Sequence, residues 1–297
     1  MDNISESPLV SIIIPTFNDW PVVCDAIDVS LKQTYKNIEI IVVDDGSTDQ
    51  TEKLLTDTYG DKIIYVRQLN HGPGSARNTG IRRCSGKYLQ FLDSDDLLDK
   101  DKISLQIDQL RTTSQLALSY CDYVNCSLAD IKKTYNRHDP FLNPEDPLHD
   151  IATKWETQLS IPIHSFLFDA ALFKEKEIYF DENLPANEDW QCWMDIFALK
   201  PKVFFLAAAL AYYRIKDLSR CRDRRKMRKA WITSINNQID RFRFNETMVQ
   251  KLVFRKKELR YLYRDASPTN QLIDKGPPIF RKLFEKVLPW RIQRIFD

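Results

Sequence analysis

The chain has 297 residues, 43% of them hydrophobic and 29% charged, a composition typical of a soluble globular protein with one large α/β domain or two smaller ones. Its formal net charge is +1, so we expect no nucleic-acid partner. The polar, acidic start "MDNISESPLV" does not resemble a signal peptide. The longest apolar run, which begins at Val203, covers about half of the ~20 residues of a spanning helix. Six cysteines without a Cys-x-x-Cys pair favour reduced thiols, and we expect a cytoplasmic protein.

Strands rich in Ile and Val alternate with helical patterns along the first half of the chain. The predicted strands are 8–14, 38–45, 62–68, 87–93 and 116–124, and the predicted helices are 21–33, 47–60, a short one within 72–86, and 100–112. This alternation indicates βαβ units and a parallel sheet. The nearly continuous apolar strands indicate a sheet that is covered on both faces.

The later chain is less regular. Residues 127–150 are polar and contain three prolines, which predicts a mobile loop. A helix is expected to begin at Glu188. From about Arg222 the pattern is helical to the end, with breaks at "DASPTN" and "KGPP".

Polar clusters follow three of the predicted strands, as "PTFND", "DDGSTD" and "DSDD". Such residues are ordinary turn formers, and each loop alone has that simple explanation. The carboxyl ends of parallel strands, however, share one edge of the sheet, where ligands bind in open α/β folds. Three polar loops at this edge favour a ligand site.

Asp93, Asp95 and Asp96 place three carboxylates within four residues, directly after a buried strand. A divalent cation would neutralise their repulsion. Mg²⁺ takes one or two protein carboxylates and completes its shell with phosphate oxygens and water. A helix cap and a solvated turn are the alternatives. Asp99 is better placed as the cap, which leaves Asp93 and Asp95 as candidate ligands.

The segment "NHGPGSARNTGI" (70–81) has a glycine-rich turn before Arg77, at a predicted helix start. Backbone N–H groups at such a start attract anions, and arginine adds a bidentate phosphate contact. The segment does not match the Walker A pattern. The chain also lacks Gly-x-Gly-x-x-Gly, so NAD or FAD binding is unsupported.

A second acidic site occurs in "NEDWQCW", where Glu188 and Asp189 begin a predicted helix beside Trp190 and Trp193. One interpretation is that the acids complement the helix dipole while the tryptophans pack in the core. The other is a general base held against an aromatic wall, able to deprotonate an acceptor hydroxyl.

Together these pieces resemble the inverting family 2 glycosyltransferases with the GT-A fold. The matching motifs are "VSIIIPTFN", "IEIIVVDDGSTD", "GPGSARNTGI", "GKYLQFLDSDD" and "NEDWQCW", in the family's order, and the resemblance covers roughly residues 8–215. It implies an α/β fold of GT-A type, with a mostly parallel Rossmann-like sheet flanked by helices. It also implies a donor-binding half (1–115), an acceptor and catalytic-base half (116–221) and a helical C-terminal region (222–297).

The resemblance also implies the roles of individual residues. The nucleotide-binding positions would be Pro15, Thr16, Phe17, Asn18, Asp44, Asp45, Arg77, Asn78, Asp93 and Ser94. Phe17 would lie beside the base, Asp44 would accept the base imide N–H, and Asp45 would order its loop. Asp95, with Asp93, would hold Mg²⁺ or Mn²⁺.

Asp189 occupies the family's catalytic-base position, with Glu188 beside it. One departure from the family lies further on. Many relatives carry Tyr-Arg-x-His where this chain has "YYRIK", with Lys216 at the histidine position. A protonated lysine cannot ligate a metal, although it can pair with a phosphate. The sequence therefore leaves open which ligands complete the metal shell.

We thus expect a metal-dependent transfer of a sugar from a nucleotide-sugar donor to a hydroxyl of a glycan or lipid-linked acceptor in polysaccharide biosynthesis. A UDP-sugar is the commonest donor in the family, while TDP- and GDP-sugars stay open. The alternative is a catalytically inactive nucleotide- or glycan-binding module on the same fold. A nucleotidyltransferase is disfavoured, because no glycine-rich basic loop follows the first strand.

Two C-terminal stretches suggest a peripheral membrane contact on the cytoplasmic face. Residues 213–231 are locally basic, and residues 279–296 combine apolar side chains at helical spacing with Arg and Lys. A solvated helix face and an amphipathic helix packed on the domain are the respective alternatives.

Overall fold

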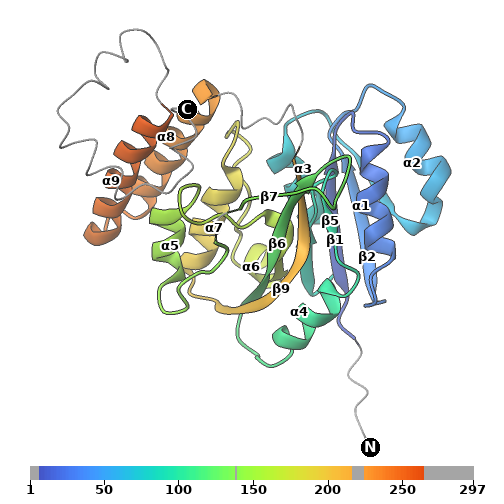
Figure 1. Cartoon of the computed structure of the whole chain (residues 1–297), viewed down its shortest axis with the longest axis horizontal. Helices are drawn as coiled ribbons and strands as arrows, with labels where there is room; N and C mark the ends of the chain where they lie inside the picture. The colour runs from blue at the N-terminus through green and yellow to red at the C-terminus, as the bar shows by residue number, and fades with distance from the viewer. Residues whose placement is uncertain (1–6, 138, 216–223, 264–297) are drawn as a thin grey trace, which may run out of the picture.

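The computed structural model describes residues 7–137, 139–215 and 224–263. In this part of the chain one nine-stranded sheet has the order β3-β2-β1-β4-β8-β6-β9-β5, with β7 paired to β6 (Figure 1). The strands are β1 (Val10–Thr16), β2 (Ile38–Asp44), β3 (Ile64–Arg67), β4 (Tyr88–Phe91), β5 (Leu97–Leu98), β6 (Ala117–Ser127), β7 (Thr134–Tyr135), β8 (Phe166–Asp169) and β9 (Lys202–Ile215).

The N-terminal half of the sheet is parallel, as the βα alternation predicted. β1 pairs in parallel with both β2 and β4, and β2 pairs in parallel with β3. Beyond β4 the sheet is mixed. β8 runs antiparallel to both β4 and β6, whereas β6 and β9 are parallel to each other. The predicted α/β class is confirmed, and the parallel half forms the Rossmann-like part.

Helices cover both faces of the sheet, and the hairpin of α8 and α9 lies at the end of the molecule opposite α1 and α2 (Figure 1). The helices are α1 (Val22–Leu31), α2 (Thr51–Tyr59), α3 (Pro73–Arg83), α4 (Lys102–Leu110), α5 (Pro147–Lys154), α6 (Ala171–Lys174), α7 (Glu188–Ala198), α8 (Arg224–Arg241) and α9 (Glu246–Leu262), with 3₁₀ turns η1 (Gly60–Lys62) and η2 (Ile163–Ser165).

Two hydrophobic cores lie on opposite faces of the sheet, because neighbouring side chains of a strand point to opposite sides. Ile12 of β1 packs with Ile27 of α1 and Ile107 of α4 in one core. Ile13, the next residue, joins Ile81 of α3 and Trp193 of α7 in the other. The second core therefore connects the sheet to the helix that begins at Glu188.

Gly80 explains how closely α3 approaches the sheet. A Cβ atom at this position would lie 2.3 Å from Cγ2 of Ile13, far inside van der Waals contact. Only glycine fits, so α3 lies directly on β1 and its first turns reach the carboxyl edge of the sheet. This close packing brings Arg77 into the candidate site.

Some expectations need correction. Residues 127–150 do not form one irregular loop, because they contain β7 and the start of α5, which is capped where Asp146 accepts from the His149 N–H at 3.0 Å. The helix predicted from 100 to 112 is shorter, and its N-cap is Asp101 rather than Asp99. The amphipathic segment 279–296 lies outside the described residues. Within the described residues, no helix is long and apolar enough to cross a bilayer.

Candidate active site

The loops after β1, β2 and β4 meet at the carboxyl edge of the parallel strands. The Asn18 backbone N–H donates to Ser47 Oγ at 2.9 Å, and the Asn18 side-chain oxygen accepts from the Thr48 N–H at 2.7 Å. Ser94 Oγ donates to Asp19 Oδ2 at 2.5 Å. These bonds confirm that the three polar clusters lie together at one edge.

The end of β1 changes from buried to exposed within four residues. Pro15 and Thr16 are buried, and Thr16 Oγ1 has no hydrogen-bond partner among the described residues. Phe17 follows with 38% of its surface exposed, and Asn18 has a φ of 47°, in the left-handed region. The aromatic ring of Phe17 is therefore available at the edge of the site, while Asn18 turns the chain towards the β2 loop.

Asp44 ends β2 fully buried, with both carboxylate oxygens engaged by the protein. Oδ1 accepts from the Ser47 N–H at 2.7 Å, and Oδ2 accepts from the Tyr65 hydroxyl at 2.5 Å. Burial, and then the adjacent Asp44 carboxylate, raise the pKa of Tyr65, so the phenol stays protonated and donates. Each carboxylate oxygen can accept a second bond, so a base N–H would have to share one of them.

Asp45 was expected to order the loop after β2, but its carboxylate bonds to residues of the loop between β3 and α3. Its Oδ1 accepts from the His71 N–H at 3.0 Å and from Gln68 Nε2 at 2.8 Å. Its Oδ2 accepts from the Gly72 N–H at 2.8 Å. This carboxylate fixes the turn that leads into α3.

Arg77 is buried between two carboxylates from distant parts of the chain. Its Nη2 donates to Asp93 Oδ1 at 2.7 Å, and its Nη1 donates to Glu188 Oε1 at 2.8 Å. The guanidinium also lies 5.4 Å from the ring centroid of Phe180. Arg77 was expected to contact a phosphate. In this structure its terminal nitrogens instead join the β4 loop to the start of α7.

Asn78 contacts the segment after β8 rather than the edge of the sheet. Its amide donates to the Phe180 carbonyl at 2.8 Å and to Glu182 Oε1 at 2.9 Å, and its oxygen accepts from the Phe180 N–H at 2.9 Å. Because both amide protons are used, this side chain positions residues 180–182. The expectation that Asn78 lies near the nucleotide stays a prediction.

Asp189 lies in the first turn of α7, partly exposed and next to Glu188. Burial and, next, the negative charge of Glu188 raise the pKa of Asp189 to about 7, although the positive charge of Arg77 acts in the opposite direction. A carboxylate with this pKa is suited to general base work near neutral pH. The neighbouring tryptophans are core residues, and Trp190 packs against Trp231 with ring centroids 5.1 Å apart.

Arg214 anchors the loop after β4 that carries Asp93 and Asp95. The backbone N–H of Arg214 donates to Asp96 Oδ1 at 2.8 Å, and its Nε donates to the Asp95 carbonyl. Its Nη1 donates to Asp25 Oδ2 of α1 at 2.7 Å. Asp96 is fully buried, with Oδ2 3.0 Å from His164 Nδ1. Asp96 therefore has a structural role, which separates it from the partly exposed Asp93 and Asp95.

The donor set suits Mg²⁺ or Mn²⁺. Asp93 and Asp95 offer hard carboxylate oxygens at the edge of the sheet, and Asp93 Oδ1 accepts from Arg77 Nη2. The described residues contain no group of three or more His, Cys, Asp or Glu side chains arranged to hold a metal. A site of two carboxylates completed by diphosphate and water is the usual arrangement for Mg²⁺. Lys216, the departure from the family motif, lies outside the described residues.

The sequence did not predict two parts of this site: the ion pair of Arg77 with Glu188, and the anchoring of the carboxylate loop by Arg214. The first joins residues 111 positions apart, for which a single sequence gives no signal. The second had a signal in the motif "YYRIK", whose arginine precedes Lys216 by two residues.

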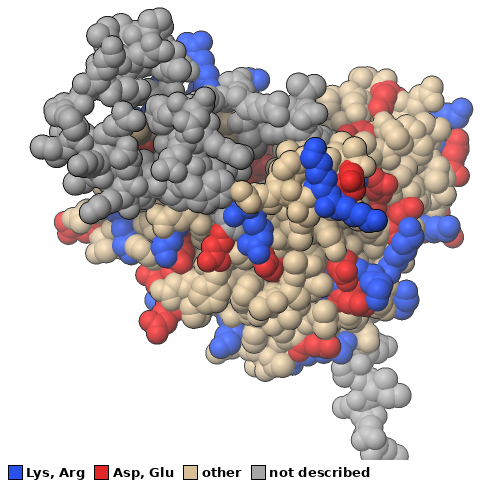
Figure 2. Space-filling view, in the orientation of Figure 1, with Lys and Arg blue, Asp and Glu red and all other residues tan. Residues whose placement is uncertain are grey.

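Surface charge on the face shown in Figure 2 is mixed, with Lys and Arg interspersed among Asp and Glu over the described part of the N-terminal half.

Known glycosyltransferases are similar to this chain in sequence. A glycosyltransferase of undetermined specificity from Rickettsia prowazekii is 38% identical over 204 residues, which are 67% of this chain and 61% of that protein. Chondroitin synthase from Escherichia coli is 40% identical over 115 residues, 38% of this chain and 17% of the synthase. The chain thus spans less than two thirds of these relatives.

Solved structures share the fold at low sequence identity. S. aureus TarS 1–349, in a complex with UDP-GlcNAc, has a TM-score of 0.64 and 20% identity over 91% of this chain and 76% of that one. The mannosyltransferase PcManGT from Pyrobaculum calidifontis, in a complex with GDP-Man and Mn²⁺, has a TM-score of 0.58 and 16% identity over 92% and 80%. The family model for glycosyl transferase family 2 matches residues 11–174. The chain belongs to glycosyl transferase family 2.

Proposed function

We propose that this glycosyltransferase transfers a sugar, with inversion, from a UDP-sugar to a hydroxyl of a glycan or lipid-linked glycan. The observation that carries the proposal is the position of Asp189. This carboxylate, with its pKa raised to about 7, lies in the first turn of α7 next to Glu188, which Arg77 connects to Asp93. A base is thereby held near the loop proposed to bind the donor.

The nucleotide would lie over the ends of β1 and β2, with the exposed ring of Phe17 beside the base. The buried Asp44 would accept the imide N–H, through an oxygen shared with Ser47 or Tyr65. Asp93 and Ser94 would face the ribose. TarS with UDP-GlcNAc supports a uridine nucleotide, whereas PcManGT with GDP-Man shows that the same fold accepts guanosine.

Asp189 would take the proton of the acceptor hydroxyl, whose oxygen forms a bond to the anomeric carbon. The bond from that carbon to the diphosphate oxygen breaks on the opposite face, which inverts the configuration, and the electron pair leaves with the nucleoside diphosphate. A divalent cation held by Asp95 and Asp93 would neutralise charge on the leaving group. Arg77 and Glu188 would hold Asp189 in a fixed position relative to the donor.

Donor hydrolysis tests the proposal before the acceptor is known. The purified chain is incubated with UDP-, TDP- and GDP-sugars and Mn²⁺, with and without excess chelator, and the released nucleoside diphosphate is measured. We expect metal-dependent release from a UDP-sugar. Donor binding seen as thermal stabilisation, without release or transfer to any glycan acceptor, would favour the inactive binding module. Release that survives thorough chelation would contradict the metal role of Asp95.

A further inference from the structure

The outward side of α9 exposes large apolar side chains among polar ones such as Glu246, Thr247 and Gln250. Four side chains of the helix are buried: Met248, Leu252, Arg255 and Leu259. A surface helix is expected to be polar on the opposite side. Here that side exposes Phe254 by 62%, Val253 by 39% and Tyr261 by 38%, and Phe244 in the preceding turn is 90% exposed.

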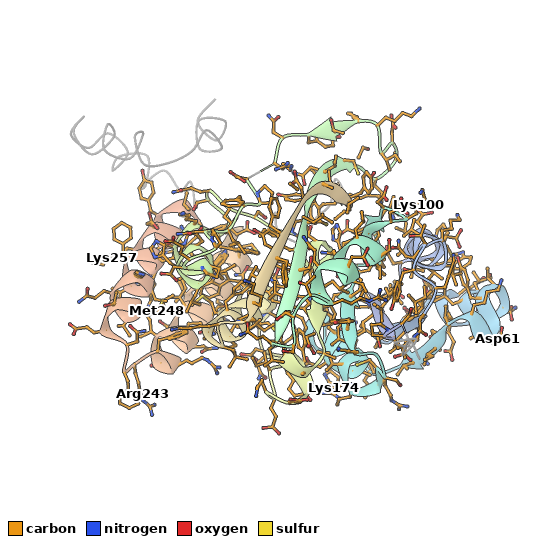
Figure 3. The ribbon with its side chains drawn as sticks, turned by 90° about the horizontal axis from the view of Figure 1, so that it is seen from below. Asp61, Lys100, Lys174, Arg243, Met248 and Lys257 are labelled. Atoms are coloured by element: carbon orange, nitrogen blue, oxygen red, sulfur yellow. The ribbon has the colours of Figure 1, made fainter. Side chains whose placement is uncertain are left out.

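Cations accompany these apolar residues. Lys257 and Arg260 are exposed on the same side of α9, and Arg243 lies over the Phe244 ring at 4.9 Å. Figure 3 shows Lys257 and Arg243 near opposite ends of α9, on the side away from the sheet. We call Arg243, Phe244, Val253, Phe254, Lys257, Arg260 and Tyr261 the α9 outer face.

Positive charge is concentrated in the hairpin of α8 and α9. Residues 224–262 contain twelve Lys and Arg but three Asp and Glu, which gives a formal charge of +9. Because the whole chain is +1, the remaining residues carry −8. A segment of this charge attracts anionic surfaces. A symmetric contact between the α9 outer faces of two copies would bring two such segments together, which disfavours a second copy as the occupant.

The hairpin is attached to the helix that carries Asp189. Gln238 of α8 donates to Asp195 Oδ1 at 3.1 Å, and Arg241 Nε lies 2.7 Å from the same oxygen. The buried Arg255 of α9 donates to Thr157 Oγ1 at 3.2 Å and to the Trp155 carbonyl. A surface that binds the α9 outer face is therefore held in a fixed relation to α7.

We propose that the α9 outer face docks on an anionic lipid bilayer. Aromatic and aliphatic side chains enter the headgroup boundary, while the adjacent Lys and Arg pair with lipid phosphates, as in helices that lie in the membrane interface. If the acceptor is lipid-linked, docking would place the acceptor near α7, the helix that carries Asp189. This consequence rests on the proposed function, whereas the membrane contact is independent of it.

Vesicle flotation of the full chain tests the docking. Vesicles of phosphatidylcholine alone are compared with vesicles that also contain phosphatidylglycerol. We expect binding to the anionic vesicles only. Lys257→Glu with Arg260→Glu should weaken binding by at least roughly 30-fold, because each lost cation contributes about a factor of five and the new carboxylates add repulsion. Phe244→Ser with Phe254→Ser should weaken it by about tenfold. Lys53→Glu with Lys62→Glu, on the opposite end of the molecule, is the charge-matched control and should bind like the unmodified chain.

Two results would overturn the docking: equal binding to neutral vesicles, or flotation of both α9 variants like the unmodified chain. The second result would put the contact elsewhere, including residues 264–297. Release of nucleoside diphosphate from a soluble donor is measured on the same samples. Variants that lose flotation but keep this rate leave the proposed function intact. A chain that floats as expected but neither hydrolyses a donor nor transfers its sugar to any glycan acceptor refutes the proposed function and leaves the docking standing.

Discussion

Arg77 Nη1 lies 2.8 Å from Glu188 Oε1, although 111 residues separate the two in the chain. The other terminal nitrogen of the same buried guanidinium lies 2.7 Å from Asp93 Oδ1. Removing either carboxylate would leave charge unbalanced in a buried place, which is costly. The ion pairs therefore fix the start of α7, and with it Asp189, against the loop proposed to hold the donor.

The charge of Glu188 should set the pH dependence of the reaction. The charge of Glu188 raises the pKa of Asp189, whereas the charge of Arg77 lowers it. Loss of the Glu188 charge removes the first effect and frees Arg77 from its ion pair. Both changes lower the pKa of Asp189 and keep this carboxylate ionised at lower pH. In Glu188→Gln the acid limb of kcat/KM should move from about pH 7 to lower pH, as a pH–rate profile would show. Glu182→Gln, which removes an exposed charge bonded to Asn78, should leave the limb in place. An unmoved limb in Glu188→Gln would contradict this coupling.

Arg214 should matter to metal affinity without being a ligand. Arg214→Met removes the bonds to the Asp95 carbonyl and to Asp25, so the loop that presents Asp93 and Asp95 loses its support. Loss of such supporting contacts costs metal affinity about 10–100-fold. Mn²⁺ titration in the presence of UDP measures this, and Arg214→Lys should recover part of it. Asp25→Asn removes a largely exposed partner and should change affinity little. Normal Mn²⁺ affinity in Arg214→Met would refute the positioning role.

The sequence predicted the parallel half of the fold well, because its signals are local. Runs of Ile and Val specify β1 and β2 to within a few residues, and the polar ends of these strands predicted the edge where the site lies. The insertion of β8 between β4 and β6 could not be predicted. Phe168 pairs with both Leu89 and Leu118, contacts that depend on the packing of the complete sheet.

The sequence named residues of the candidate site but not the contacts between them. Asp189 lies in the first turn of α7, the helix predicted to begin at Glu188, whereas Asp45 orders the turn before α3 instead of the loop after β2. Arg77 was expected at a phosphate, since a helix start with arginine suits an anion. Its carboxylate partners come from α7 and the β4 loop, and only the close approach of α3 at Gly80 brings them together.

A buried lysine should give the fold a distinct pH dependence. Lys102 Nζ donates to Gln90 Oε1 at 2.6 Å and to Gln106 Oε1 at 2.5 Å, and burial lowers the pKa of Lys102 from 10.5 to about 8. Between these pH values the unfolded chain holds the proton more tightly than the folded one, so this group increases stability as pH rises. Relative to low pH, the gain in the free energy of unfolding from this group should reach about 3 kcal/mol at the upper of the two pKa values.

Urea unfolding at pH 8 and pH 10 measures this effect as the difference between the chain and Lys102→Met. Between pH 8 and pH 10, the free energy of unfolding should increase less for Lys102→Met than for the unmodified chain. Lys53→Met, at an exposed position, should follow the unmodified chain. Parallel curves for Lys102→Met and the unmodified chain would show that Lys102 does not titrate in this window.

Turnover by Asp189→Asn tests the central claim most directly. The amide keeps the size of the side chain but cannot accept the acceptor proton, so kcat for sugar transfer should fall by about 10²–10⁴ while donor affinity, measured by titration, stays near that of the unmodified chain. Asp195→Asn, on the same helix but facing α8, is the matched control and should retain most turnover. Transfer at a near-normal rate by Asp189→Asn would contradict the account.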